Sequence, residues 1–87
     1  MKTIIENSTQ ESKYLLEDDV AVVMSEGHIT IGQPAIFIIG DMNNANATLI
    51  ENVIPPEDWR GCKYLFENGV WTVNPNWTDP NIKFENS

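Results

Sequence analysis

Two turn signals dominate this sequence, and both are typical of β-hairpins. Residues 66–71 read Phe-Glu-Asn-Gly-Val-Trp, and residues 25–28, Ser-Glu-Gly-His, follow a run of valines ending in a methionine. Asn-Gly is a preferred pair for two-residue hairpin turns because both of its residues accept positive φ angles. Short stretches of β-branched and aromatic residues joined by such turns predict a small, antiparallel β domain.

A two-residue turn also fixes which side chains face each other across a hairpin. For a turn at residues 26–27, the expected pairs are Met24 with Ile29 and Val22 with Ile31. For a turn at residues 68–69, they are Phe66 with Trp71 and Tyr64 with Val73. The first set places four large apolar side chains on one sheet face, which we expect to face the core.

Further apolar runs predict the remaining strands. The unbroken run at residues 35–39, Ala-Ile-Phe-Ile-Ile, lies between Pro34 and Gly40. We expect it to be a central strand, because it offers no polar face to water. Residues 3–6 predict at most a short edge strand. The other strand candidates are residues 13–16, 20–25, 48–53 and 62–67.

Residues 55–61 follow a different pattern, with prolines first, carboxylates next and a glycine last. This order favours one short helical turn near residues 56–60, with Trp59 as its buried anchor. The predicted fold is therefore all-β or nearly so, a small antiparallel β-barrel or sandwich of six to seven short strands. We expect a polar N-terminal lead-in at 1–11, a single β domain at 12–73 and an extended C-terminal arm at 74–87.

The charge of the chain excludes two classes of partner. The net charge is −8, and Lys13 is the one basic residue between positions 3 and 59, against ten carboxylates. Nucleic acids and anionic membranes both require clustered lysine and arginine, so we expect neither as a partner. The longest apolar run has the length of a strand, and the chain turns polar at Glu6, so we expect no membrane span and no signal peptide.

No residue pattern indicates catalysis. Cys62 is the only cysteine, so it cannot form a disulfide within the chain, and a lone cysteine is usually a small buried residue. His28 lies at a hairpin turn with no titratable partner fixed beside it by the sequence. We expect no catalytic residue and no enzyme activity.

No residue pattern indicates a metal or a cofactor either. Asp41 and Asn43 have the spacing that begins a calcium-binding loop. The sixth position of that loop requires glycine and the twelfth requires glutamate, but the chain has Asn46 and Asn52 there. We therefore expect a plain loop at this place, and no cofactor or metal elsewhere.

Two sets of residues are candidates for contact with a partner. The aromatic set consists of Trp77 with Pro75 in the arm, and Trp59; a tryptophan on a proline-stiffened arm is a typical interface anchor. Whether Trp77 packs on its own domain or on a neighbouring subunit stays open. The acidic set consists of Glu17, Asp18, Asp19, Glu57 and Asp58, with Glu51 as a further member.

A run of turns and aromatic residues occupies the C-terminal half. Residues 55–66 read PPEDWRGCKYLF, and residues 69–77 read GVWTVNPNW. This pattern resembles short modules of tailed phages, particularly those of marine cyanobacteria, where it recurs in small uncharacterised or virion-associated proteins. The resemblance covers roughly residues 55–80 and implies a viral origin and a structural or host-interaction role.

These observations lead to two expected roles. The first is a non-enzymatic phage protein of the virion or its assembly, located in the virion or the host cytoplasm. It would form homo-oligomers or bind other phage proteins through an edge strand and the Trp77 arm. The alternative is an acidic binder of a basic host protein surface, which requires the acidic set to form one contiguous face, whereas scattered carboxylates favour the first role.

Overall fold

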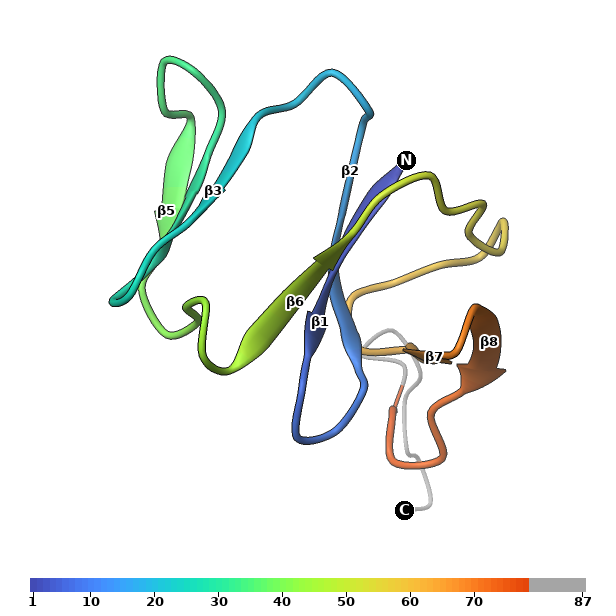
Figure 1. The fold of residues 1–87 in the computed structure, drawn as a ribbon. Coiled ribbons are helices and arrows are strands. Elements are labelled where there is room, and N and C mark those ends of the chain that lie inside the picture. The colour runs from blue at the N-terminus through green and yellow to red at the C-terminus, as the bar shows by residue number, and fades with distance from the viewer. Residues whose placement is uncertain (79–87) are drawn as a thin grey trace, which may run out of the picture.

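The computed structural model describes residues 1–78, and these residues form an all-β fold (Figure 1). Three antiparallel sheets have the strand orders β2-β1-β6, β3-β4-β5 and β7-β8. Within the described range none of the three sheets closes into a barrel. The eight strands are β1 (Lys2–Glu6), β2 (Ser12–Leu16), β3 (Val22–Met24), β4 (Ile29–Ile31), β5 (Phe37–Ile39), β6 (Ala47–Ile50), β7 (Tyr64–Glu67) and β8 (Val70–Val73).

Strand β1 is the central strand of its sheet, so the expectation of an edge strand in a polar lead-in is wrong. It pairs with β2 on one side and β6 on the other. Thr3, Ile4 and Ile5 are at most 2% exposed, because both faces and both edges of the strand are covered. The partner strand β6 lies more than forty residues away in the sequence, so the pattern around residues 3–6 carries no sign of it. The additional full strand also raises the strand count above the six to seven expected.

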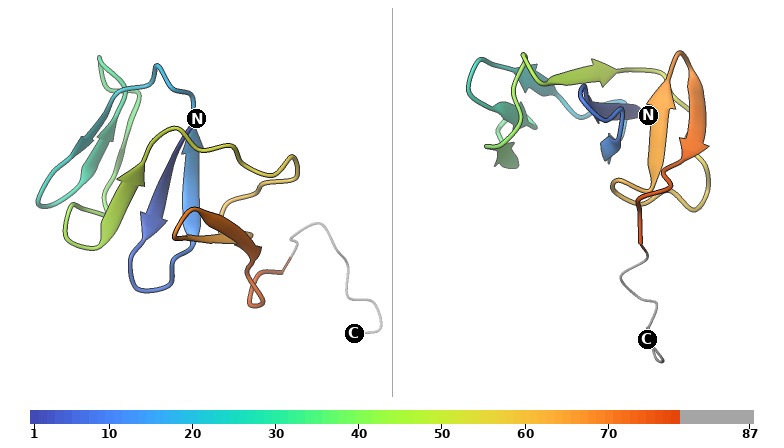
Figure 2. Two further views of the ribbon diagram at one scale, coloured as in Figure 1. Left: turned by 45° about the vertical axis from the view of Figure 1, so that its right-hand side comes forward. Right: turned by 90° about the horizontal axis from the view of Figure 1, so that it is seen from below.

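Consecutive side chains of β1 point into two different cores. Ile4 belongs to a cluster formed mainly by β4, β5 and the start of β6, whose other buried members are Ile29, Ile31, Ile39, Met42 and Ala47. Ile5 belongs to a second cluster with Val53 and Phe66. The sheet β2-β1-β6 therefore lies between the sheet β3-β4-β5 and the hairpin β7-β8, and the views agree on this order (Figure 2).

Both predicted hairpin registers are confirmed. Met24 pairs with Ile29 and Val22 with Ile31, while Phe66 pairs with Trp71 and Tyr64 with Val73. The two turns differ in backbone geometry. Asn68 and Gly69 both have positive φ, at 54° and 79°, as a type I′ turn requires, whereas neither Glu26 nor Gly27 is in the left-handed region.

Strand β5 is an edge strand, which corrects the expectation that residues 35–39 lie centrally. Strand β4 is the centre of this sheet, and its Ile29 and Ile31 are fully buried. No further described strand flanks β5, because β6, the next strand along the chain, pairs with β1 instead. An apolar run thus predicted a strand correctly but gave no information on how many neighbours it has.

Residues 56–60 form one hydrogen-bonded turn rather than a helical one. The Trp59 N–H donates to the Pro56 carbonyl at 3.2 Å, and no described residue of the segment is helical. Two prolines remove backbone donors, and so short a helix would gain few hydrogen bonds for the residues it orders. Trp59 is half-buried, as its indole N–H donates to the Ser12 hydroxyl at 2.9 Å.

Candidate interaction surface

Three consecutive large apolar side chains are exposed at strand β5. Ile36, Phe37 and Ile38 are 72%, 42% and 59% exposed, and we call them the β5 edge. The Phe37 ring lies 6.2 Å from the Tyr14 ring, so it packs partly against the middle sheet, while the two isoleucines face water. A free strand edge with apolar side chains is a typical site of pairing with another chain. The sequence alone does not reveal this edge, because an unbroken apolar run is equally typical of a buried strand.

The chain segment around the β5 edge carries no charged side chain, although Asp19 from the connection between β2 and β3 lines the hollow beside Ile36. No Asp, Glu, Lys or Arg occurs between residues 27 and 40, although the chain carries a net charge of −8. A shallow hollow of about 610 Å³ adjoins Ile36 and is lined by residues 32–34 and 19–21. The β5 edge is therefore apolar and lies in an uncharged segment of an acidic protein.

A second hollow lies between the end of β6 and the hairpin β7-β8. It has a volume of about 520 Å³ and includes Phe66 and Trp71, whose ring centroids are 4.5 Å apart. Ile54 also lines it and is largely exposed. Its most buried lining residues, Val53 and Phe66, belong to the second core, so part of this hollow is the outer surface of that core.

The aromatic candidates contact their own chain. The Lys63 ammonium lies 5.2 Å from the centre of the Trp77 ring, and the backbone N–H of Trp77 donates to the Asn74 carbonyl at 3.2 Å. Trp59 is held by Ser12, and Pro75 is exposed. The described part of the arm therefore folds back on its own domain, while residues 79–87 of the predicted arm lie outside the described residues.

Asn74 fixes the start of that arm in the body of the domain. The residue is buried, and its side-chain amide donates to Glu11 Oε2 and to the Cys62 carbonyl, each at 2.9 Å. Its backbone N–H donates to the Lys63 carbonyl at 2.8 Å. These contacts make Asn74 a structural part of the β domain.

The ionised Asp58 carboxylate is paired with its neighbours in a small polar cluster. Lys63 Nζ lies 2.8 Å from Asp58 Oδ2, and the Tyr64 hydroxyl donates to Asp58 Oδ1 at 2.6 Å. The Lys63 ammonium and the Tyr64 hydroxyl together lower the pKa of Asp58 to about 2. The same carboxylate raises the pKa of Tyr64, because it stabilises the protonated phenol.

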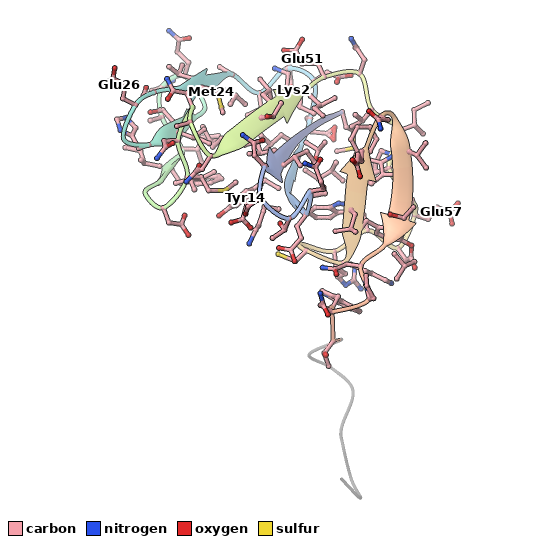
Figure 3. The ribbon with its side chains drawn as sticks, turned by 60° about the horizontal axis from the view of Figure 1, so that its bottom comes forward. Lys2, Tyr14, Met24, Glu26, Glu51 and Glu57 are labelled. Atoms are coloured by element: carbon pink, nitrogen blue, oxygen red, sulfur yellow. The ribbon has the colours of Figure 1, made fainter. Side chains whose placement is uncertain are left out.

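The acidic candidates come from two different connections between strands. Residues 17–19 lie on the connection between β2 and β3, whereas Glu57 and Asp58 lie on the connection between β6 and β7 (Figure 1). Glu51 and Glu57 are also well separated in Figure 3. Asp18 contacts the Met1 ammonium at 2.7 Å. Two of these carboxylates therefore already have cationic partners within the chain.

The titratable candidates His28 and Cys62 lie in different surroundings. Cys62 lines a hollow of about 270 Å³ together with Lys13 and Glu6, and His28 is not part of its lining. Desolvation opposes protonation of Lys13, but Glu6, Cys62 and Glu11 together raise the pKa of Lys13. Within residues 1–78 there is no group of three or more side chains suited to hold a metal ion.

The loop that resembles the start of a calcium site is closed by its own hydrogen bonds. Asn43 Oδ1 accepts from the backbone N–H groups of Ala45 and Asn46, and Asn46 Oδ1 accepts from the N–H of Asn43. The side-chain oxygens thus hold the turn itself, as Asn side chains commonly do.

Among the residues described, no helix has the length and apolar character needed to cross a membrane.

No family model, curated protein or solved structure matches this chain. What the geometry supports best is an interaction surface, with the β5 edge as its centre.

Proposed function

We propose that this chain is a non-enzymatic protein of a tailed phage, a small component of the virion or of its assembly that forms homo-oligomers. The observation that carries the proposal is the β5 edge, where Ile36 and Ile38 face water at the free edge of the sheet β3-β4-β5. Soluble monomers commonly protect such edges with charges, prolines or a covering segment. At Phe37–Ile39 the described residues provide neither a charge nor a covering strand, which supports a partner at this place.

The phage origin is supported by the resemblance over residues 55–80. In the fold, residues 55–61 form the turn that brings Trp59 to Ser12, and residues 64–73 form the β7-β8 hairpin. The motif residues Phe66 and Trp71 thus contribute to the second core, and the β5 edge remains free for contacts on the other side of the middle sheet. This division suits a small protein that repeats within an assembly.

An acidic binder of a basic host surface is the less supported alternative. Such a binder needs neighbouring carboxylates without partners, but the acidic residues occupy two separate connections, and Asp18 and Asp58 form ion pairs within the chain. The alternative also leaves the exposed isoleucines without a role.

Mass measurement by light scattering behind size exclusion tests the proposal, over a series of sodium chloride concentrations. We expect a discrete oligomer that persists or strengthens as salt rises, because salt screens the repulsion between acidic copies and leaves apolar contacts intact. A monomer at every salt concentration would contradict the proposal. Salt-sensitive binding of a basic protein such as lysozyme by that monomer would then support the alternative.

A further inference from the structure

We infer that the β5 edge pairs with the β5 edge of a second copy, antiparallel, about a two-fold axis at Ile38. The two sheets β3-β4-β5 then join into one continuous six-stranded sheet. The inference rests on the proposed function, because it names the contact that would build the oligomer. Four observations lead to it: the direction of the free backbone groups, the pairing register, the side chains on the outer face and the placement of charge.

The free backbone groups of β5 follow from the hydrogen bonds of its neighbours. The Ser25 N–H donates to the His28 carbonyl, and the Gly32 N–H donates to the Ala21 carbonyl. Since hydrogen-bonded pairs alternate along an antiparallel ladder, the backbone groups of Thr30 also point toward β3. Those of Ile29 and Ile31 then point toward β5, and Ile38, opposite Thr30, directs its N–H and C=O away from the sheet.

The outward groups of Ile38 allow a closed, symmetric contact. In antiparallel pairing of β5 with its copy, each Ile38 N–H can donate to the Ile38 carbonyl of the other chain. The same register places Ile36 opposite Gly40, which has no side chain to obstruct it. The ladder ends before Ile36, because the Ile36 N–H donates to the Ile31 carbonyl of its own chain. A register centred on Ile36 would instead place Pro34 opposite Ile38 and lose that hydrogen bond.

Side chains on both faces of the sheet match this arrangement. Ile38 shares the outer face with Thr30 and Val23, since the three residues are in register across the sheet. Val23 and Ile38 are both exposed in the single chain, and pairing brings the two copies of Ile38 together across the two-fold axis. On the inner face, Phe37 comes to lie beside Ile39 of the second copy, which covers the exposed part of its ring.

The charge distribution identifies a second copy as the occupant. Two chains of net charge −8 repel each other at most orientations, and the neutral stretch at 27–40 is where they approach with the least repulsion. In the register centred on Ile38, Asp41 faces Ala35 of the other chain rather than another carboxylate. A basic partner would find no complementary charge on this stretch.

Disulfide trapping tests the register directly. In a Cys62→Ser background, Ile38→Cys places two thiols across the axis, at a Cα separation of about 5.5 Å that a disulfide can span. The matched control is Val70→Cys, because Val70 is also an exposed strand residue. With copper phenanthroline as the oxidant, we expect the Ile38→Cys dimer to form at least about tenfold faster than the Val70→Cys dimer.

Charge substitution gives an independent measurement. Ile38→Lys opposes two ammonium groups at the axis, so we expect the mass to fall to that of the monomer, whereas Val70→Lys should keep the mass of the parent chain. Circular dichroism shows whether both variants keep the fold. An oligomer that survives Ile38→Lys, with equal trapping at both positions, overturns the inference and leaves the proposed function standing. A monomeric parent chain overturns both.

Discussion

At the scale of single residues, a chain of hydrogen bonds with a defined direction joins Trp59 to strand β2 and strand β2 to strand β1. Trp59 Nε1–H donates to Ser12 Oγ, which lies 2.6 Å from Thr3 Oγ1. Because the Thr3 hydroxyl donates its one hydrogen to the Tyr14 carbonyl at 2.8 Å, the hydrogen between the two hydroxyls must come from Ser12. Ser12 and Thr3 thus each donate once and accept at least once while fully buried. The sequence offered no sign of this arrangement, since Ser12 and Trp59 are 47 residues apart.

Replacing Ser12 with alanine should destabilise the fold more than an exposed serine would. The Ser12→Ala variant removes the acceptor of the half-buried Trp59 indole N–H and the donor to the fully buried Thr3 hydroxyl, and the loss of these two hydrogen bonds costs about 1–3 kcal/mol. We expect the free energy of unfolding, measured by urea denaturation, to fall by that amount. Ser8→Ala at an exposed position is the control and should change it by less than about 0.5 kcal/mol. Equal effects of both substitutions would contradict the role assigned to Ser12.

At the scale of elements, local pairing was predictable from the sequence and long-range pairing was not. The Asn68-Gly69 turn determines which residues of β7 and β8 face each other, and that register is confirmed. The central position of β1 depends on β6, and the edge position of β5 depends on a strand that is absent beside it in the described fold. Neither of these long-range dependences can be recognised in a short window of the sequence.

The candidate site was harder to predict for a related reason. Trp77 and Trp59 stand out in the sequence because tryptophan is common at interfaces, yet both contact their own chain. Ile36 and Ile38 stand in a run that is typical of a buried strand, but they are exposed. Exposure of an apolar residue depends on what packs over it, and that depends on the arrangement of all three sheets.

The two hairpin turns should respond differently to alanine. Gly69 has a φ of 79°, and a Cβ there would meet no atom within 4 Å, so the cost of Gly69→Ala comes from the backbone alone. We expect a loss of about 1–2 kcal/mol in the free energy of unfolding. Gly27→Ala is the matched control, since Gly27 has equal space and no left-handed φ, and it should cost under about 0.5 kcal/mol. A larger effect at Gly27, measured by the same urea denaturation, would refute this reading of the turns.

For the whole molecule, repulsion between the excess negative charges opposes the folded state. The described ion pairs of the acidic groups involve the Met1 ammonium, Lys13 and Lys63, while the net charge of the chain remains −8. Folding concentrates the unpaired carboxylates, and the resulting repulsion is screened by salt.

Salt should therefore stabilise the molecule. We expect the midpoint of thermal unfolding to rise by about 2–6 °C between low salt and about 0.5 M sodium chloride, which corresponds to roughly 0.5–1 kcal/mol. Differential scanning calorimetry at constant protein concentration measures the shift, and Ile38→Lys separates it from any effect of salt on association. A midpoint that falls with salt would mean that the ion pairs outweigh the repulsion.

The double-sided burial of β1 has a consequence for how the chain is made. Strand β1 leaves the ribosome before its partner β6 and before the segments that shield Ile4 and Ile5, the last of which lies near Phe66. The hairpins β3-β4 and β7-β8 close locally and fast, whereas β1 needs contacts that span most of the sequence. Strand β1 is thus enclosed only after the segment around Phe66 has been translated, so the fold of these residues cannot be completed while the chain is still short.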